Sequence, residues 1–199
     1  MKNKRFLLLN VCILLFITIL ITGCMENEKK NNGQTEEPDI YLTVTYDDYF
    51  ANYTLEYIES LDSYSGTGGK IKTKLLPDTV EINDLHEYTG VCITTILDEI
   101  SNLPDNYLIK ITASDGWSSN YTKNETLGYV DVYNETGNII QNETAVMILA
   151  YKEEGSYYSE IDPDNEIGPF RVAFVGNNVI TSSSLWTKMV IAIKIISEQ

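Results

Sequence analysis

The stretch YTGVCITTILDEI, residues 88–100, carries the clearest helical pattern in the chain. Its apolar side chains recur at the spacing i, i+3, i+4, i+7, at Ile93, Ile96, Leu97 and Ile100. This spacing predicts a short helix with one buried stripe. Thr94 is a candidate cap for the start of the helix, and the segment NLPDN at residues 102–106 ends it.

Segments typical of β-strands lie on both sides of this helix. They are apolar and rich in β-branched residues, at 107–113, 145–151, 170–175 and 188–196. Upstream, residues 41–49 alternate like a strand, and residues 55–61 place Leu55, Ile58 and Leu61 on one helical face. Asp115-Gly116 predicts a turn. Because strands outnumber helices and no regular βαβ alternation occurs, the fold class is α+β.

Five segments together indicate a family. They are YTGVCITTILDEI, LIKITASDGWSSNYT, AVMILAYKEEG, GPFRVAFVG and SSLWTKMVIAIKI, starting at residues 88, 108, 145, 168 and 183. In this order they resemble the molybdopterin-binding domain of the sulfite oxidase family. The resemblance covers about residues 88–196, with a looser match upstream. It implies a mixed, strand-rich α+β domain with few short helices, over residues 40–199.

The resemblance also implies a cofactor site. The family's oxidoreductases hold the pterin phosphate with the arginine of the G-P-hydrophobic-R strand, and Arg171 matches that arginine. Glu166 and Leu185 stand where the family has a supporting histidine and lysine. The cofactor-binding candidates are therefore Arg171 and Lys188, with Lys70 and the Gly68-Gly69 backbone as further donors.

The metal ligand of the family is missing. It is a cysteine upstream of the TGV segment, where this chain has SYSGTGGKIKTKLL, residues 63–76, without cysteine. Cys92 lies downstream of that place and is expected to be a half-buried thiol, so no metal ligand and no catalytic residue are assigned. One guanidinium in a strongly acidic domain compensates little of the charge of molybdopterin. We therefore expect a domain without the cofactor, in which Arg171 pairs with a carboxylate such as Asp115 or Glu166.

The N-terminus predicts export and lipid anchoring. Lys2, Lys4 and Arg5 precede an uncharged apolar run at residues 6–21. The run ends in ITGC, which matches the lipobox of prokaryotic lipoproteins and makes Cys24 the lipidation site. Residues 1–23 are then a signal peptide and residues 24–39 a flexible, acidic tether. The alternative is an uncleaved signal anchor. In both cases the domain is extracytoplasmic and attached to the cell membrane.

Charge and cysteine content limit the partners. The formal net charge is −15, and it falls to −18 when the three basic residues of the leader are removed. Nucleic acid is therefore a poor partner, because phosphate binding needs clustered Lys and Arg. Beyond Cys24 the only cysteine is Cys92, so the domain has no disulfide within the chain.

Other chemical motifs favour structural roles. His86, the only histidine, is expected on the polar surface, and the segment at residues 162–166 is expected to be a solvated acidic loop. Trp117 lies either at a pocket edge or in hairpin packing. The tyrosines at 151, 157 and 158 form either a binding surface or strand packing.

Two functions follow from these observations. In the first, a surface lipoprotein uses a cofactor-free, sulfite oxidase-like domain as a module that binds a small molecule or a surface protein. In the second, the chain is an exported molybdopterin-dependent oxidoreductase with atypical metal coordination.

Overall fold

The computed structural model describes residues 39–73, 80–82, 85–164 and 168–198. The predicted signal peptide, the tether up to Pro38 and Glu166 lie outside these residues. Within the described ranges, no helix is long and apolar enough to cross a membrane.

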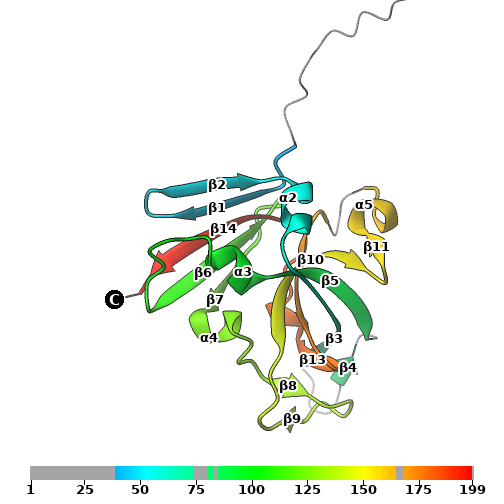
Figure 1. Cartoon of the computed structure of the whole chain (residues 1–199). Helices are drawn as coiled ribbons and strands as arrows, with labels where there is room; N and C mark the ends of the chain where they lie inside the picture. The colour runs from blue at the N-terminus through cyan, green and yellow to red at the C-terminus, as the bar shows by residue number, and fades with distance from the viewer. Residues whose placement is uncertain (1–38, 74–79, 83–84, 165–167, 199) are drawn as a thin grey trace, which may run out of the picture. The chain divides into compact units, whose positions relative to one another are not determined.

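The first sheet joins the two ends of the domain (Figure 1). In the described residues it has five strands, in the order β2 (Tyr49–Tyr53), β1 (Leu42–Tyr46), β14 (Val190–Ser197), β6 (Tyr107–Ala113) and β7 (Ser118–Thr122). Strands β1 and β14 run parallel, with Val44 opposite Ile193, and the other pairs are antiparallel. In β6 every second side chain is buried, as expected for a strand with one face on the core.

The second sheet carries most of the candidate site. Its main order is β11 (Ser156–Tyr157), β10 (Val146–Glu153), β5 (His86–Cys92), β3 (Ser63–Thr73), β13 (Val179–Ser182), β8 (Val132–Tyr133) and β9 (Ile139–Ile140). Strand β12 (Arg171–Val175) pairs with β10, and β4 (Val80–Ile82) pairs with β3.

Strands β3, β5, β10 and β12 close into a ring. The sheet pairing runs from β3 through β5 and β10 to β12. The ring closes where the Thr67 N–H donates to the Gly176 carbonyl at 2.9 Å and the Gly176 N–H donates to the Thr67 carbonyl at 3.1 Å. As a result, β12 is held at both of its edges.

The described helices are short, and some of them are capped by a side chain at the start. They are α2 (Leu55–Ser60), α3 (Ile93–Leu97), α4 (Lys123–Thr126), α5 (Tyr158–Ile161) and the 3₁₀ turn η1 (Ser183–Leu185). The Thr54 hydroxyl accepts from the Tyr57 N–H at 3.1 Å at the start of α2. At α4, Thr122 and Glu125 form a capping box.

Two hydrophobic cores lie on opposite faces of β12. Val172 and Phe174 belong to the main core, which also contains residues of the first sheet such as Ile109 and Ile193. Ala173 and Val175 belong to a second, smaller core with Tyr88, Ile148, Ala150 and Tyr158. Because side chains alternate along a strand, Arg171 starts β12 on the side of the second core.

Most of the predicted strands are confirmed, and two local predictions are wrong. Residues 107–113 form β6, and the strands expected at 145–151, 170–175 and 188–196 appear as β10, β12 and β14. Residues 41–49 are not one strand, because Asp47 adopts φ +50° and reverses the chain between β1 and β2. Thr94 does not cap α3, since Cys92 occupies the cap position and makes no side-chain capping bond.

Candidate functional site

A pocket of about 420 Å³ lies where the two sheets meet. The second sheet contributes Lys70 and Lys72 of β3 and Arg171 of β12, and the first contributes the β6–β7 turn with Asp115 and Trp117. The segment between η1 and β14 supplies the remaining wall, with Trp186, Thr187 and Lys188. We call this cavity the basic pocket.

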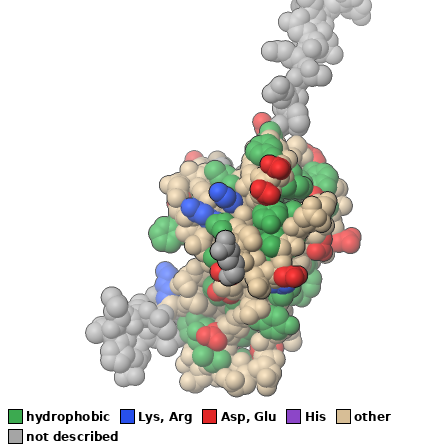
Figure 2. All heavy atoms as spheres, turned by 90° about the vertical axis from the view of Figure 1, so that its left-hand side faces the viewer, with side chains coloured by type: hydrophobic (Ala, Val, Ile, Leu, Met, Phe, Trp, Pro, Cys, Tyr) green, Lys and Arg blue, Asp and Glu red, His purple; other side chains and the backbone are tan. Residues whose placement is uncertain are grey.

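The basic pocket concentrates positive charge in an acidic chain. Four of the eight Lys and Arg in the described ranges line it, at positions 70, 72, 171 and 188. Asp115 is the only carboxylate among the described lining residues. Figure 2 shows a related separation on one face, where Lys and Arg side chains lie mainly on the left and most Asp and Glu side chains towards the right. Such a cleft attracts anions although the whole chain repels them.

Backbone hydrogen bonds bring Arg171 and Lys188 to the same wall. The Val172 N–H donates to the Thr187 carbonyl at 2.7 Å, and the Val190 N–H donates to the Phe170 carbonyl at 2.9 Å. The segment that carries Lys188 therefore runs beside the start of β12. The two residues that the family resemblance selected, which are 17 positions apart in the sequence, line one cavity together with Lys70.

Arg171 forms a buried ion pair with Glu153 of β10. The Nη1 to Oε2 distance is 2.9 Å, and the side chains of Arg171 and Glu153 are only 11% and 15% exposed. The expected partners were Asp115 or Glu166; Asp115 lies in the pocket lining, and Glu166 is outside the described residues. The pairing of β10 with β12 explains the difference, because it places Ala150 opposite Arg171 and Glu153 just beyond.

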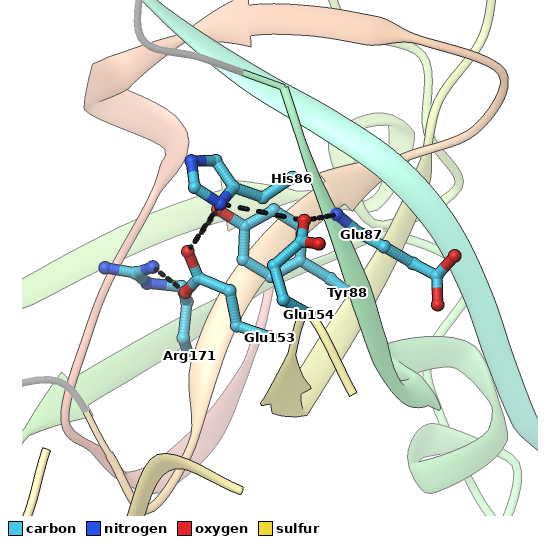
Figure 3. A network of polar contacts seen from close by, with 6 residues as sticks. All are labelled: His86, Glu87, Tyr88, Glu153, Glu154 and Arg171. Carbon is cyan, nitrogen blue, oxygen red and sulfur yellow. Dashed lines mark hydrogen bonds and ion pairs between the residues drawn. The ribbon is translucent and has the colours of Figure 1, made fainter. Parts of the chain in front are cut away.

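Glu153 is also the centre of a wider polar network (Figure 3). His86 Nδ1 lies 3.4 Å from Glu153 Oε1 and 3.7 Å from Glu154 Oε1. The Tyr88 hydroxyl donates to Glu153 Oε1 at 3.4 Å. The His86 side chain is 40% exposed, so it lies at the surface as expected but contacts two carboxylates. Figure 3 shows Glu153 between His86 and Arg171, which ties the basic pocket to this network.

Lys70 and Tyr158 are two polar side chains that are largely removed from solvent beside Arg171. Burial, followed by the positive charge of Arg171, lowers the pKa of Lys70. The Lys70 ammonium lies 5.3 Å from the centre of the Trp186 ring. The Tyr158 hydroxyl is buried and has no hydrogen-bond partner in the part of the chain that the structure describes, and the Arg171 guanidinium lies 5.8 Å from its ring centre. A bound anion would stabilise the charged form of Lys70.

The two tryptophans are fixed differently. The Trp186 indole N–H donates to Thr181 Oγ1 at 2.8 Å, and its ring packs against Tyr88 with centroids 5.2 Å apart. Gly68 makes room for this ring, because a Cβ atom there would lie 3.1 Å from Trp186 Cη2 and 2.5 Å from the Phe174 carbonyl oxygen. Trp117 is 66% exposed on its turn, so it lies at the pocket edge and not in hairpin packing.

The lining residues suit a phosphate but not a thiolate-held molybdenum. Four cations can neutralise an anionic group. The described lining, however, contains neither thiol nor imidazole, and in the described ranges no group of three or more His, Cys, Asp or Glu is placed to hold a metal. Cys92 packs against the second core, and burial raises the pKa of its thiol, the opposite of what a metal ligand needs.

Sequence reasoning did not find Lys72, Glu153 or Tyr88. Lys72 was missed because the Ser- and Gly-rich segment that forms β3 has low strand propensity. The spacing of Lys70 and Lys72 was a usable signal, since residues i and i+2 share one face of a strand. Glu153 and Tyr88 carry no local signal, because only the pairing of β5 with β10 brings them together.

Comparisons with known proteins show the fold only. No family matches the sequence, and no curated protein matches it. Among solved structures, the chain is similar to the sulfane dehydrogenase SoxCD from Paracoccus pantotrophus, with a TM-score of 0.54 and 14% sequence identity. The match covers 80% of this chain and 39% of that chain, so this chain spans well under two thirds of that protein. The likeness supports a sulfite oxidase-like fold for the strand-rich, mixed-sheet domain.

Proposed function

We propose that this chain is a lipid-anchored, extracytoplasmic protein whose sulfite oxidase-like domain binds a small anion in the basic pocket. The anion carries a phosphate, sulfate or carboxylate group. The domain does so without a thiolate-bound molybdenum.

The observation that carries this proposal is that four cations line one cavity: Lys70, Lys72, Arg171 and Lys188. These cations repel one another, and the charges of Arg171 and Lys72 both contribute to the lowered pKa of Lys70. The chain, with a formal net charge of −15, has many carboxylates that could separate or neutralise these cations. Among the described residues, Arg171 is the one cation of the lining with an ion-pair partner, Glu153, and the three lysines line the same cavity. Its volume of about 420 Å³ lies within the ~300–1,000 Å³ range of small-molecule sites.

The test is a titration of the full-length chain, purified in neutral detergent, with sulfate and with inorganic phosphate. We expect Lys72→Gln to weaken binding about five-fold, the effect of one partly exposed charge contact. The matched control is Lys194→Gln on β14, which removes an exposed lysine that does not line the pocket. Equal effects of the two substitutions would mean that anions respond only to the overall charge.

The same preparation distinguishes the anion-binding function from the second candidate, a molybdopterin-dependent oxidoreductase. Cells grown with molybdate supply the metal, and the purified chain is analysed for molybdenum and for pterin released on denaturation. The four cations would suit the phosphate of molybdopterin, which is the observation that favours the alternative of an exported molybdopterin-dependent oxidoreductase. Stoichiometric metal and pterin would establish that alternative and overturn the cofactor-free proposal.

The anchor is tested separately at Cys24. Metabolic labelling with a fatty acid should mark the wild-type chain, and Cys24→Ala should abolish the label. A lipoprotein signal predicts that the labelled form has lost residues 1–23. An unlabelled chain of full length in the membrane fraction would instead identify an uncleaved signal anchor.

A further inference from the structure

A second cavity, of about 270 Å³, has the opposite character to the basic pocket. Four of its nine described lining residues are tyrosines, at positions 41, 151, 157 and 158. Leu55 and two prolines complete the apolar lining. Asp162 supplies a carboxylate, and none of the described lining residues is a lysine or arginine. We call this cavity the tyrosine cage.

The rings of the tyrosine cage already attract cations from within the chain. Tyr151 and Tyr157 are stacked with centroids 6.3 Å apart and an angle of 24° between their planes. The Lys152 ammonium lies 4.2 Å from the centre of the Tyr157 ring and 6.0 Å from that of Tyr151. These distances are within the ~6 Å range of cation–π attraction. Two of the four tyrosine rings therefore already interact with a cation of the chain itself.

Carboxylates around the cage reinforce this preference. Burial, followed by the negative charge of Glu59, raises the pKa of the Tyr151 hydroxyl. Glu59 Oε1 is itself buried and has no hydrogen-bond partner among the described residues. Glu59 and Asp162 thus place negative charge near the cage, where it offsets the Lys152 ammonium and the Arg171 guanidinium, which lies 5.8 Å from the Tyr158 ring centre.

We propose that the tyrosine cage binds a small organic cation that carries an alkylated ammonium group. An inorganic cation such as Ca²⁺ needs six to eight oxygen ligands, and the cage offers mostly carbon surface. An alkylated ammonium instead buries its methyl groups against ring faces while its charge interacts with the ring quadrupoles. The cavity is smaller than the ~300–1,000 Å³ of drug-sized sites, so the ligand is small.

The experiment compares choline with its neutral isostere, 3,3-dimethyl-1-butanol, on the full-length chain in neutral detergent. The two probes have nearly the same shape, and only one is charged. We expect choline to bind on the order of ten-fold more tightly, because desolvated ring faces favour the charged form. Calorimetry or the shifts of tyrosine resonances measure both dissociation constants. Equal binding of the two probes, or no binding of choline at about 10 mM, would overturn the proposal.

Substitutions at the cage sharpen the test. Tyr157→Phe keeps the ring face and should retain choline binding, whereas Tyr157→Ala should weaken it about ten-fold. Lys152→Gln removes the competing internal ammonium and should raise choline affinity without changing the binding of the neutral probe. Lys194→Gln is the matched control and should change neither. A Lys152→Gln variant with unchanged or weaker choline affinity would contradict a cation site.

This inference is independent of the anion site. Inorganic phosphate is titrated into the same variants, and Tyr157→Ala should bind it as wild type does. A loss of choline binding with retained phosphate binding assigns the effect to the cage and not to unfolding. Tighter binding of a neutral sugar or a proline-rich peptide than of choline would assign the cage to another ligand class and overturn the proposal.

Discussion

The Arg171–Glu153 pair makes a quantitative prediction about stability. Both side chains are almost fully buried, and their charged atoms are 2.9 Å apart. Replacing Arg171 by Met keeps the apolar stem but leaves the Glu153 carboxylate buried without its main partner. Breaking a buried pair on one side typically costs about 3–5 kcal/mol. His86 and Tyr88 still contact Glu153, at 3.4 Å each, so we expect a loss near the lower limit, about 3 kcal/mol.

A double-substitution cycle tests the origin of that loss. In Arg171→Met/Glu153→Leu the uncompensated charge is absent, and apolar replacements of buried pairs are often close to neutral. We therefore expect the double variant to be more stable than Arg171→Met, with a coupling energy of about 2 kcal/mol. Urea unfolding followed by circular dichroism at neutral pH gives the free energies, and an unchanged denaturant slope confirms that the same surface unfolds.

Two outcomes for Arg171→Met would contradict a stabilising role of the Arg171–Glu153 pair. If Arg171→Met costs less than about 1 kcal/mol without ligand, the pair does not stabilise the fold. If the same variant also loses the stabilisation that sulfate or phosphate gives to the wild-type chain, Arg171 serves the ligand alone. A loss of both stability and ligand response assigns the two roles to one guanidinium.

Three other predictions concern separate features of the domain. Gly68→Ala should destabilise the fold by about 2 kcal/mol, because the new Cβ would lie 2.5 Å from the Phe174 carbonyl oxygen. Thermal unfolding measures the loss, with Ser65→Ala on the same strand as the control. Burial raises the pKa of Tyr121 from 10.0 to about 12. The stabilisation linked to the neutral Tyr121 hydroxyl is therefore complete below pH 10 and is lost as the pH rises through 12. The urea midpoint should fall over this interval, and it should fall less steeply in Tyr121→Phe. Burial raises the pKa of the Cys92 thiol. Iodoacetamide at neutral pH should therefore modify this thiol at least about ten-fold more slowly in the folded chain than in the urea-unfolded chain. Equal rates would show that the thiol is accessible.

The sequence was sufficient for elements with a local pattern. Residues 107–113 alternate clearly and form β6, and Arg171 and Lys188 belong to segments with a recognisable order. The hairpin at residues 42–53 was not predicted because Asp47 and Asp48 interrupt an otherwise continuous alternation without a glycine. A positive φ at Asp47 is a tertiary outcome, which side-chain periodicity does not report.

The candidate site depended more strongly on long-range pairing. Glu153 became the partner of Arg171 through the register of β10 with β12, and Tyr88 reached Glu153 through the register of β10 with β5. Strand β3 has little strand propensity in its Ser- and Gly-rich first half, and the close approach of Phe174 and Trp186 explains Gly68. None of these contacts has a counterpart in local sequence spacing.

The closed ring of β3, β5, β10 and β12 determines how the domain opens. Strand β5 lies between β3 and β10, and β12 is held by β10 on one edge and by Thr67 and Thr187 on the other. Amide hydrogens in these strands can therefore exchange with deuterium only when several pairings break together, whereas those of β2, at an edge of the first sheet, exchange by fraying. A protease that cuts the exposed edge would accordingly leave the ring, and with it Arg171 and Lys70, as the last intact fragment.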